Sequence, residues 1–111
     1  MDVPKVLIKD LAKDLGVNTE VAEALVRKVI DYLDRPCCWS VGFARLLLDL
    51  VADVKVRDVL RGLGIELGDP DLASEGLLRF GRILDTIITY LEKAGIVEYV
   101  RSDGVVNLVR R

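Results

Sequence analysis

Apolar residues recur at helical spacing through the first third of the chain. The first such run has its apolar positions at Val6, Leu7, Leu11 and Leu15. This spacing predicts a helix, which Gly16 should end in a left-handed conformation. Asn18 or Thr19 is expected to cap a second, longer helix that ends at Pro36. Its predicted apolar seam consists of Val21, Leu25, Val29 and Leu33, with Ala22, Val26 and Tyr32 beside it. Residues 2–35 therefore predict a helical pair.

The middle of the chain predicts two further helices. Residues 41–54 are apolar on most sides, so we expect this helix near the centre of the core. Residues 55–63 predict a shorter helix closed by Gly62 and Gly64. The segment 65–73 is rich in glycine, proline and aspartate, which is typical of a loop.

The last third predicts one long helix, a short break at Ala94-Gly95 and a β-hairpin. We expect the helix to span 74–94, with Ser74 or Asp71 as its N-cap. A two-residue type I′ turn at Asp103-Gly104 would pair residues 97–101 with 105–110. In that register Tyr99 faces Leu108, and Arg101 faces Val106. One face of the hairpin, directed at the helices, would then carry Val97, Tyr99, Val106 and Leu108.

A polar stripe follows one side of the predicted long helix. Its members, at steps of three and four residues, are Glu75, Arg79, Arg82, Thr86, Thr89 and Lys93. Arginine can bond two acceptors of guanine in the major groove, and threonine can contact a thymine methyl group. We therefore predict that the stripe reads DNA bases through Arg79, Arg82, Thr86 and Thr89. The alternative is an ordinary solvated face, because Asp85 and Glu92 flank the stripe and would repel phosphates.

The segment LEKAGIV, where the long helix runs straight into the hairpin, resembles the recognition helix and wing of winged helix-turn-helix domains. The resemblance covers about residues 41–111 and implies a mainly helical fold of about five helices with a C-terminal β-hairpin. It also implies binding of double-stranded DNA through helix 74–94 and a wing at 97–110. In that reading the residues that meet phosphates are Lys93, Arg57, Arg61, Arg101 and Arg110. The loop 65–73 is longer than the usual turn between the last two helices of such domains.

Composition and charge leave a second function open. The chain has 111 residues, enough for a single domain, of which 51% are hydrophobic and 31% charged. Its formal net charge is −2, which disfavours a strong duplex binder, since non-specific affinity comes mostly from lysine and arginine. A winged helix can instead be a protein-docking surface. The alternative is therefore an interaction module, a subunit of a replication, transcription or repair complex.

The sequence has few groups of residues that could carry out catalysis or bind a metal or cofactor. The chain has no histidine, which excludes histidine-based acid–base catalysis and metal ligation. Cys37 and Cys38 are adjacent, so they cannot form a spaced CxxC ligand pair, and we interpret them as small packing residues. The carboxylates of Asp69 and Asp71 are too few for a dedicated calcium loop. We therefore expect a non-enzymatic protein without cofactor or metal, acting as a transcriptional regulator or chromatin-associated factor.

The sequence also predicts where the protein is located and how it assembles. No apolar run approaches the ~18 residues of a membrane helix, and no signal-peptide pattern opens the sequence, so we expect a cytoplasmic protein. Ten arginines against six lysines, with no glutamine, favour a thermophilic prokaryote as the source. The helical pair 2–35 lies outside the winged-helix core 41–111 and is a candidate for homodimerisation, with Leu25, Val29 and Leu33 as the seam.

Overall fold

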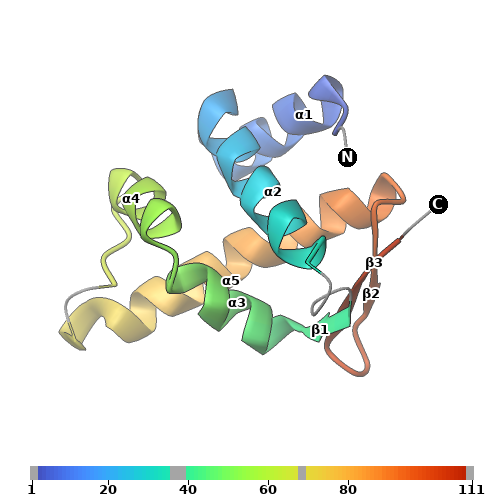
Figure 1. Cartoon of the computed structure of the whole chain (residues 1–111). Helices are drawn as coiled ribbons and strands as arrows, with labels where there is room; N and C mark the ends of the chain where they lie inside the picture. The colour runs from blue at the N-terminus through green and yellow to red at the C-terminus, as the bar shows by residue number, and fades with distance from the viewer. Residues whose placement is uncertain (1–2, 36–39, 68–69, 110–111) are drawn as a thin grey trace.

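The computed structural model describes residues 3–35, 40–67 and 70–109. It confirms a mainly helical chain with a small antiparallel sheet at one end (Figure 1). The elements in order are α1 (Lys5–Leu15), α2 (Thr19–Leu33), β1 (Ser40–Gly42), α3 (Phe43–Val51), α4 (Val54–Gly62), α5 (Pro70–Lys93), β2 (Val97–Val100) and β3 (Val105–Leu108). Helix α5 runs behind the other helices along the molecule and leads directly into the sheet (Figure 1). Within the described ranges, no helix is both long enough and apolar enough to cross a lipid bilayer.

Helices α1 and α2 form the predicted pair. Gly16 ends α1 with a φ of 69°, and the Asn18 side chain caps α2 by accepting a hydrogen bond of 2.8 Å from the Val21 N–H. Val6, one of the apolar residues whose spacing predicted this helix, is 69% exposed. The burial of α1 comes instead from Ile8, Leu11 and Ala12.

The predicted dimerisation seam belongs to the chain's own core. Leu25, Val29 and Leu33 are 2%, 1% and 0% exposed, so a second copy has no access to them. Their burial follows from the packing of α2 against neighbouring helices, which already covers its apolar face. This part of the prediction is wrong, whereas homodimerisation through another surface of residues 2–35 stays a prediction.

Helix α3 is shorter than predicted at both ends, because a strand precedes it and Asp53 caps the next helix, α4. Residues 40–42 form β1, which pairs antiparallel with β3 and gives the strand order β1-β3-β2. The helix begins at Phe43 and buries only Leu46 and Leu50, whereas Leu48 is 54% exposed. A central position for this helix was therefore a wrong prediction. The helix has more apolar residues than fit on the one side that packs against the core, and the others lie at the surface.

The hairpin has the predicted strands in a different register. Val97 pairs with Leu108 and Tyr99 with Val106, so residues 101–104 form a four-residue loop in place of a two-residue turn. A type I′ turn needs positive φ at both central residues, but among the described residues only glycines have it, with Gly104 at 64°. The register differs by two residues, which preserves the alternation of faces. The four apolar residues therefore share one face, as predicted, but Arg101 lies in the loop.

Helix α5 begins at Pro70, earlier than the predicted Ser74. Proline suits the first turn of a helix because the N–H that it lacks would have no partner there. The buried face of α5 consists of Phe80, Leu84, Ile87, Ile88 and Leu91. At the other end, Gly95 takes a φ of 74° and the Ile96 N–H donates to the Leu91 carbonyl at 2.9 Å, which confirms the predicted break before the hairpin.

Candidate interaction surface on α5

The predicted polar stripe lies together on the solvent side of α5. Glu75, Arg79, Arg82 and Lys93 are exposed, and Thr86 and Thr89 are half-buried. The two threonine hydroxyls donate to carbonyls of their own helix, Thr86 to Arg82 at 3.0 Å and Thr89 to Asp85 at 2.8 Å. Such bonds to the preceding turn direct a hydroxyl back along the helix. The stripe is therefore one surface, but its hydroxyls are already bonded within it.

Most of the predicted DNA-contacting arginines bind other groups of the protein. Arg79 donates to the Gly64 carbonyl at 3.2 Å and so ties α5 to the segment after α4. Arg57 donates to the Val51 carbonyl at 2.6 Å. Arg61 forms ion pairs with Asp58 at 3.6 Å and with Glu66 at 3.4 Å.

Arg82 differs from these three, since the structure gives its guanidinium no hydrogen bond or ion pair within the part of the chain that it describes.

The arginine of the hairpin loop folds back onto α5. Arg101 forms an ion pair with Glu92 at 3.0 Å and donates to the Thr89 hydroxyl at 3.2 Å. Its guanidinium also lies 4.5 Å from the centre of the Tyr99 ring, and Tyr99 stacks on Phe43 with ring centres 5.7 Å apart. This arrangement fixes the loop to the C-terminal half of α5. Arg110, the other predicted wing contact, lies outside the described residues.

The charges on the solvent side of α5 cancel. Arg79, Arg82 and Lys93 are offset by three carboxylates on the same helix, Glu75, Asp85 and Glu92. The Lys93 ammonium lies 5.6 Å from the centre of the Tyr90 ring, where a cation is attracted to the ring face. A surface of this composition produces little net field to attract a polyanion.

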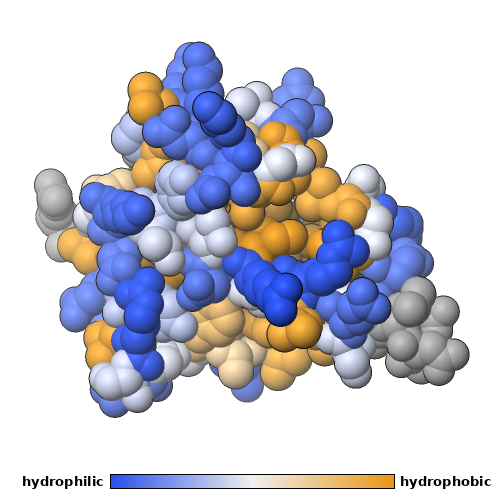
Figure 2. Space-filling model, turned by 180° about the vertical axis from the view of Figure 1, so that it is seen from behind, coloured by the Kyte–Doolittle hydropathy of each residue, from blue (hydrophilic) through white to orange (hydrophobic). Residues whose placement is uncertain are grey.

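An apolar groove lies between α3 and α5, beside the stripe. Phe43 and Leu47 of α3 line it together with Leu77, Leu78 and Gly81 of α5, and its volume is about 750 Å³. The polar residues that line it are Ser74, Arg82, Asp85 and Thr86. Leu78 is an apolar residue on the polar side of the helix, and its side chain is 59% exposed. The space-filling view from behind shows a face of mixed character, with hydrophobic areas bordered by hydrophilic side chains (Figure 2).

This groove was not predicted from the sequence. One signal was present, because Leu78 is three residues after Glu75 and four before Arg82, which places an apolar residue within the stripe. The contribution of α3 could not be found this way, since it depends on how two helices pack.

Two carboxylates connect the helices around α3. The Tyr32 hydroxyl of α2 donates to Asp49 of α3, which also pairs with Arg45 at 3.1 Å. These two hydrogen bonds hold the pKa of Asp49 below its usual range. Burial, followed by the bond to Asp49, raises the pKa of Tyr32 above its ordinary value.

The second carboxylate, Asp53, has two roles. It caps α4 by accepting hydrogen bonds from the backbone N–H groups of Lys55 at 2.8 Å and Val56 at 3.2 Å, and it pairs with Lys28 of α2 at 3.1 Å. Partial burial raises the pKa of Asp53, but the bonds from Lys28 and the two N–H groups outweigh it and hold this pKa below its usual range. Both carboxylates therefore fix the arrangement of α2, α3 and α4.

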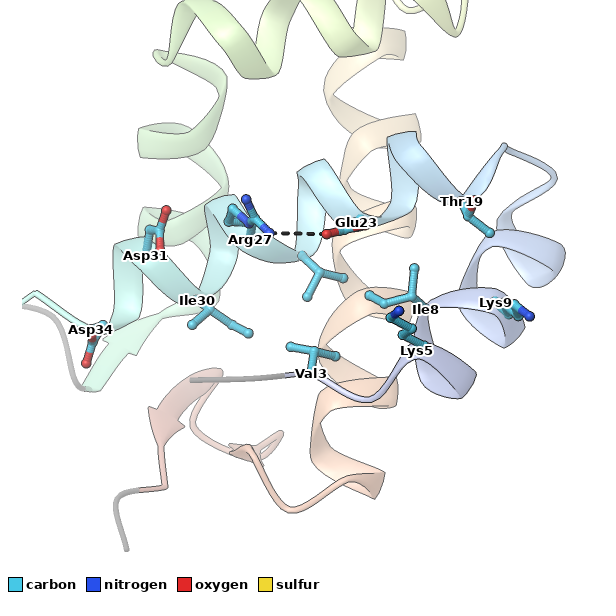
Figure 3. A pocket seen from close by; sticks show the side chains of 11 residues that line it. Val3, Lys5, Ile8, Lys9, Thr19, Glu23, Arg27, Ile30, Asp31 and Asp34 are labelled. Carbon is cyan, nitrogen blue, oxygen red and sulfur yellow. Dashed lines mark hydrogen bonds and ion pairs between the residues drawn. The ribbon is translucent and has the colours of Figure 1, made fainter.

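A cleft of about 660 Å³ lies between α1 and α2 (Figure 3). Val3, Ile8 and Ile30 point toward one another across it, and an exposed ion pair of 3.1 Å joins Arg27 to Glu23 at its rim (Figure 3). On its apolar floor, Ile8 and Ile30 are each 7% exposed, and Val26 is 1% exposed. Among the residues that the structure describes, no group of histidine, cysteine, aspartate and glutamate side chains is arranged to hold a metal ion. Cys37 and Cys38 lie outside those residues.

Comparison with known proteins gives no relative. No model of a known protein family matches the chain, and no match is found among curated proteins or solved structures.

Proposed function

We propose that the chain is a non-enzymatic interaction module that docks on a partner protein through the groove between α3 and α5. The observation that carries this proposal is the apolar groove itself, with Leu78 more than half exposed at its edge. Exposed apolar residues that gather on one surface are a feature of interaction sites, whereas isolated ones are common on any protein. A role as a subunit of a replication, transcription or repair complex is part of this proposal. A cytoplasmic location is the prediction from the sequence that accompanies it.

The charge of the same surface supports protein docking. The solvent side of α5 carries three acidic and three basic side chains, and one of the three acids, Glu92, also pairs with Arg101. Affinity for duplex DNA rises with the number of phosphates that lysine and arginine neutralise. A protein partner needs no such excess, because the apolar centre of an interface supplies most of the affinity and its charged rim supplies specificity.

Double-stranded DNA is the second candidate, with the chain as a winged-helix transcriptional regulator or chromatin-associated factor. Arg82 favours it, because this exposed guanidinium has no partner among the described residues and lies midway along the predicted recognition helix. The ion pairs of Arg61 and Arg101 are exposed, and such pairs are worth only about 0–1 kcal/mol. Phosphates could therefore replace the carboxylates at little cost.

Site-specific photo-crosslinking tests the docking proposal. Benzoylphenylalanine replaces Leu78 in the full chain expressed in its own host, and the matched control carries it in place of Val6, which is 69% exposed on α1. We expect a discrete protein adduct from position 78 that position 6 does not give. Equal adducts from both positions, or none from position 78, would contradict docking through the groove.

Fluorescence anisotropy with random duplex DNA, titrated across salt, tests the second candidate. Micromolar binding that weakens steeply with salt and is reduced in Arg82→Ala would support DNA binding through α5. The absence of binding at low salt would exclude it and leave protein docking.

A further inference from the structure

The groove between α3 and α5 is long enough to receive a short helix. Its lining on α5 extends from Ser74 to Thr86, which at 1.5 Å per residue is about 18 Å, or between three and four helical turns. A trough between two helices receives the side-chain ridge of a third. At Gly81 the floor carries no side chain, and an added Cβ would lie 4.0 Å from the Leu47 Cδ2 atom. A side chain of the docking segment therefore meets no side chain of residue 81 at this point.

The rim of the groove carries one unpaired charge of each sign. Arg82 and Asp85 lie three residues apart on α5, and neither side chain forms an ion pair or a side-chain hydrogen bond within the described part of the chain. This distinguishes them from the neighbouring arginines, since Arg79 and Arg101 are both bonded to other groups of the protein. Side chains three residues apart on a helix project to the same side. The two charges therefore form an ordered pair along one wall of the groove.

We infer that the segment that docks here is an amphipathic α-helix, with apolar residues at i, i+4 and i+7 and a carboxylate and a cation placed opposite Arg82 and Asp85. The apolar residues cover Leu77, Leu78 and the floor at Gly81, and the two charges complete the rim. This inference rests on the proposed docking function and specifies the chemistry of the partner. Helix-in-groove binding of this kind takes its affinity from the apolar face, and the charges set the orientation.

Two designed peptides of about 15 residues test this inference, a length that spans ~22 Å as a helix. Both are stapled alanine-rich helices with leucines at i, i+4 and i+7. In the first, glutamate and lysine flank the leucines in the order complementary to Arg82 and Asp85, and in the second the two are exchanged. Calorimetry with the full chain should show that the first peptide binds up to about tenfold more tightly. In the double variant Arg82→Glu with Asp85→Lys, the preference should be reversed.

Groove filling provides an independent readout. Gly81→Leu should abolish binding of the first peptide, whereas the matched control Gly62→Leu, at an open position on α4, should leave it unchanged. Both variants are checked by thermal unfolding, and the charge-reversal variant keeps the test decisive if Gly81→Leu does not fold. Equal affinity for both peptides, or binding that persists in a folded Gly81→Leu, would overturn the inference.

Two further outcomes separate this inference from the function on which it rests. If neither peptide binds but position 78 gives a specific crosslinked protein, docking is supported and the helical partner is overturned. If light scattering shows a dimer of the chain that Gly81→Leu dissociates, the occupant is a second copy, which also overturns the inference.

Discussion

Gly76 tests how the segment after α4 packs on α5. Gly76 is buried on α5, and a Cβ added there would lie 2.8 Å from the carbonyl oxygen of Glu66 and 2.9 Å from Leu67 Cδ2. The segment cannot simply move away, because the Ile65 N–H donates to the Leu60 carbonyl at 2.9 Å. Gly76→Ala should therefore force a backbone shift. Gly81→Ala is the matched control, since its Cβ would have only an ordinary contact at 4.0 Å.

The magnitude follows from two opposing terms. Alanine is favoured over glycine inside a helix by about 1 kcal/mol, and both variants share this gain. Overpacking typically costs ~1–3 kcal/mol, and only Gly76→Ala is subject to it. The difference between the two variants isolates the close contact, because the helix-propensity terms cancel. We expect Gly81→Ala to be more stable than the unmodified chain, and Gly76→Ala to be less stable than Gly81→Ala by about 1–3 kcal/mol.

Urea denaturation followed by the helical circular dichroism signal measures both free energies of unfolding. Equal slopes for the two variants would show that the comparison concerns the same folded and unfolded states. If both substitutions stabilise the chain equally, residues 65–67 do not pack against Gly76 and the reasoning fails.

Three further predictions concern the contacts that hold the surface in place. Asp53→Ala should destabilise the chain by about 1 kcal/mol through loss of the α4 cap, whereas Asp53→Asn should retain most of the cap, as measured by urea denaturation. Tyr32→Phe should lower the free energy of unfolding at neutral pH by removing the bond to Asp49. That bond lowers the pKa of Asp49 in the folded chain, so it contributes fully to the free energy of unfolding at pH values above the pKa of the unfolded carboxyl. The difference in this free energy between Tyr32→Phe and the unmodified chain should therefore vanish as the pH falls through the pKa of the folded carboxyl. A difference that stays constant down to low pH would contradict this assignment. Arg101→Ala should cost at most about 1 kcal/mol and increase hydrogen exchange in the 101–104 loop, because the pair that it removes is exposed.

The elements whose structure is set by residues close to them in the sequence could be predicted. Gly16 and Asn18 mark a helix end and a helix start through their own backbone and side-chain chemistry, and the alternation of faces in the hairpin follows from strand geometry. Strand β1 could not be predicted, because its three residues acquire strand geometry only by pairing with residues 105–107 at the other end of the chain. The early start of α5 at Pro70 was missed because the loop-like composition of 65–73 outweighed the preference of proline for a first helical turn.

In the candidate site, too, features set by the local sequence could be predicted, and contacts made by folding could not. The period of the helix was sufficient to place the stripe from Glu75 to Lys93 on one side of α5. It could not show that Arg79 binds the Gly64 carbonyl or that Arg101 returns to Glu92, since both contacts join residues brought together by folding. The apolar groove was missed for the same physical reason, because two of its apolar lining residues, Phe43 and Leu47, come from α3.

The two candidate functions make different demands on the hairpin loop. Duplex binding through Arg101 requires this side chain to leave Glu92, Thr89 and the face of Tyr99, and the Glu92 carboxylate would then lie beside phosphates without its ion-pair partner. Protein docking requires no such rearrangement, because the groove is formed while the loop is closed, and the stack of Tyr99 on Phe43 supports one of the groove's own lining residues. Binding that needs no reorganisation retains more of its interaction energy as affinity. The closed loop therefore favours docking, and a duplex would have to supply the free energy of opening it from new phosphate contacts.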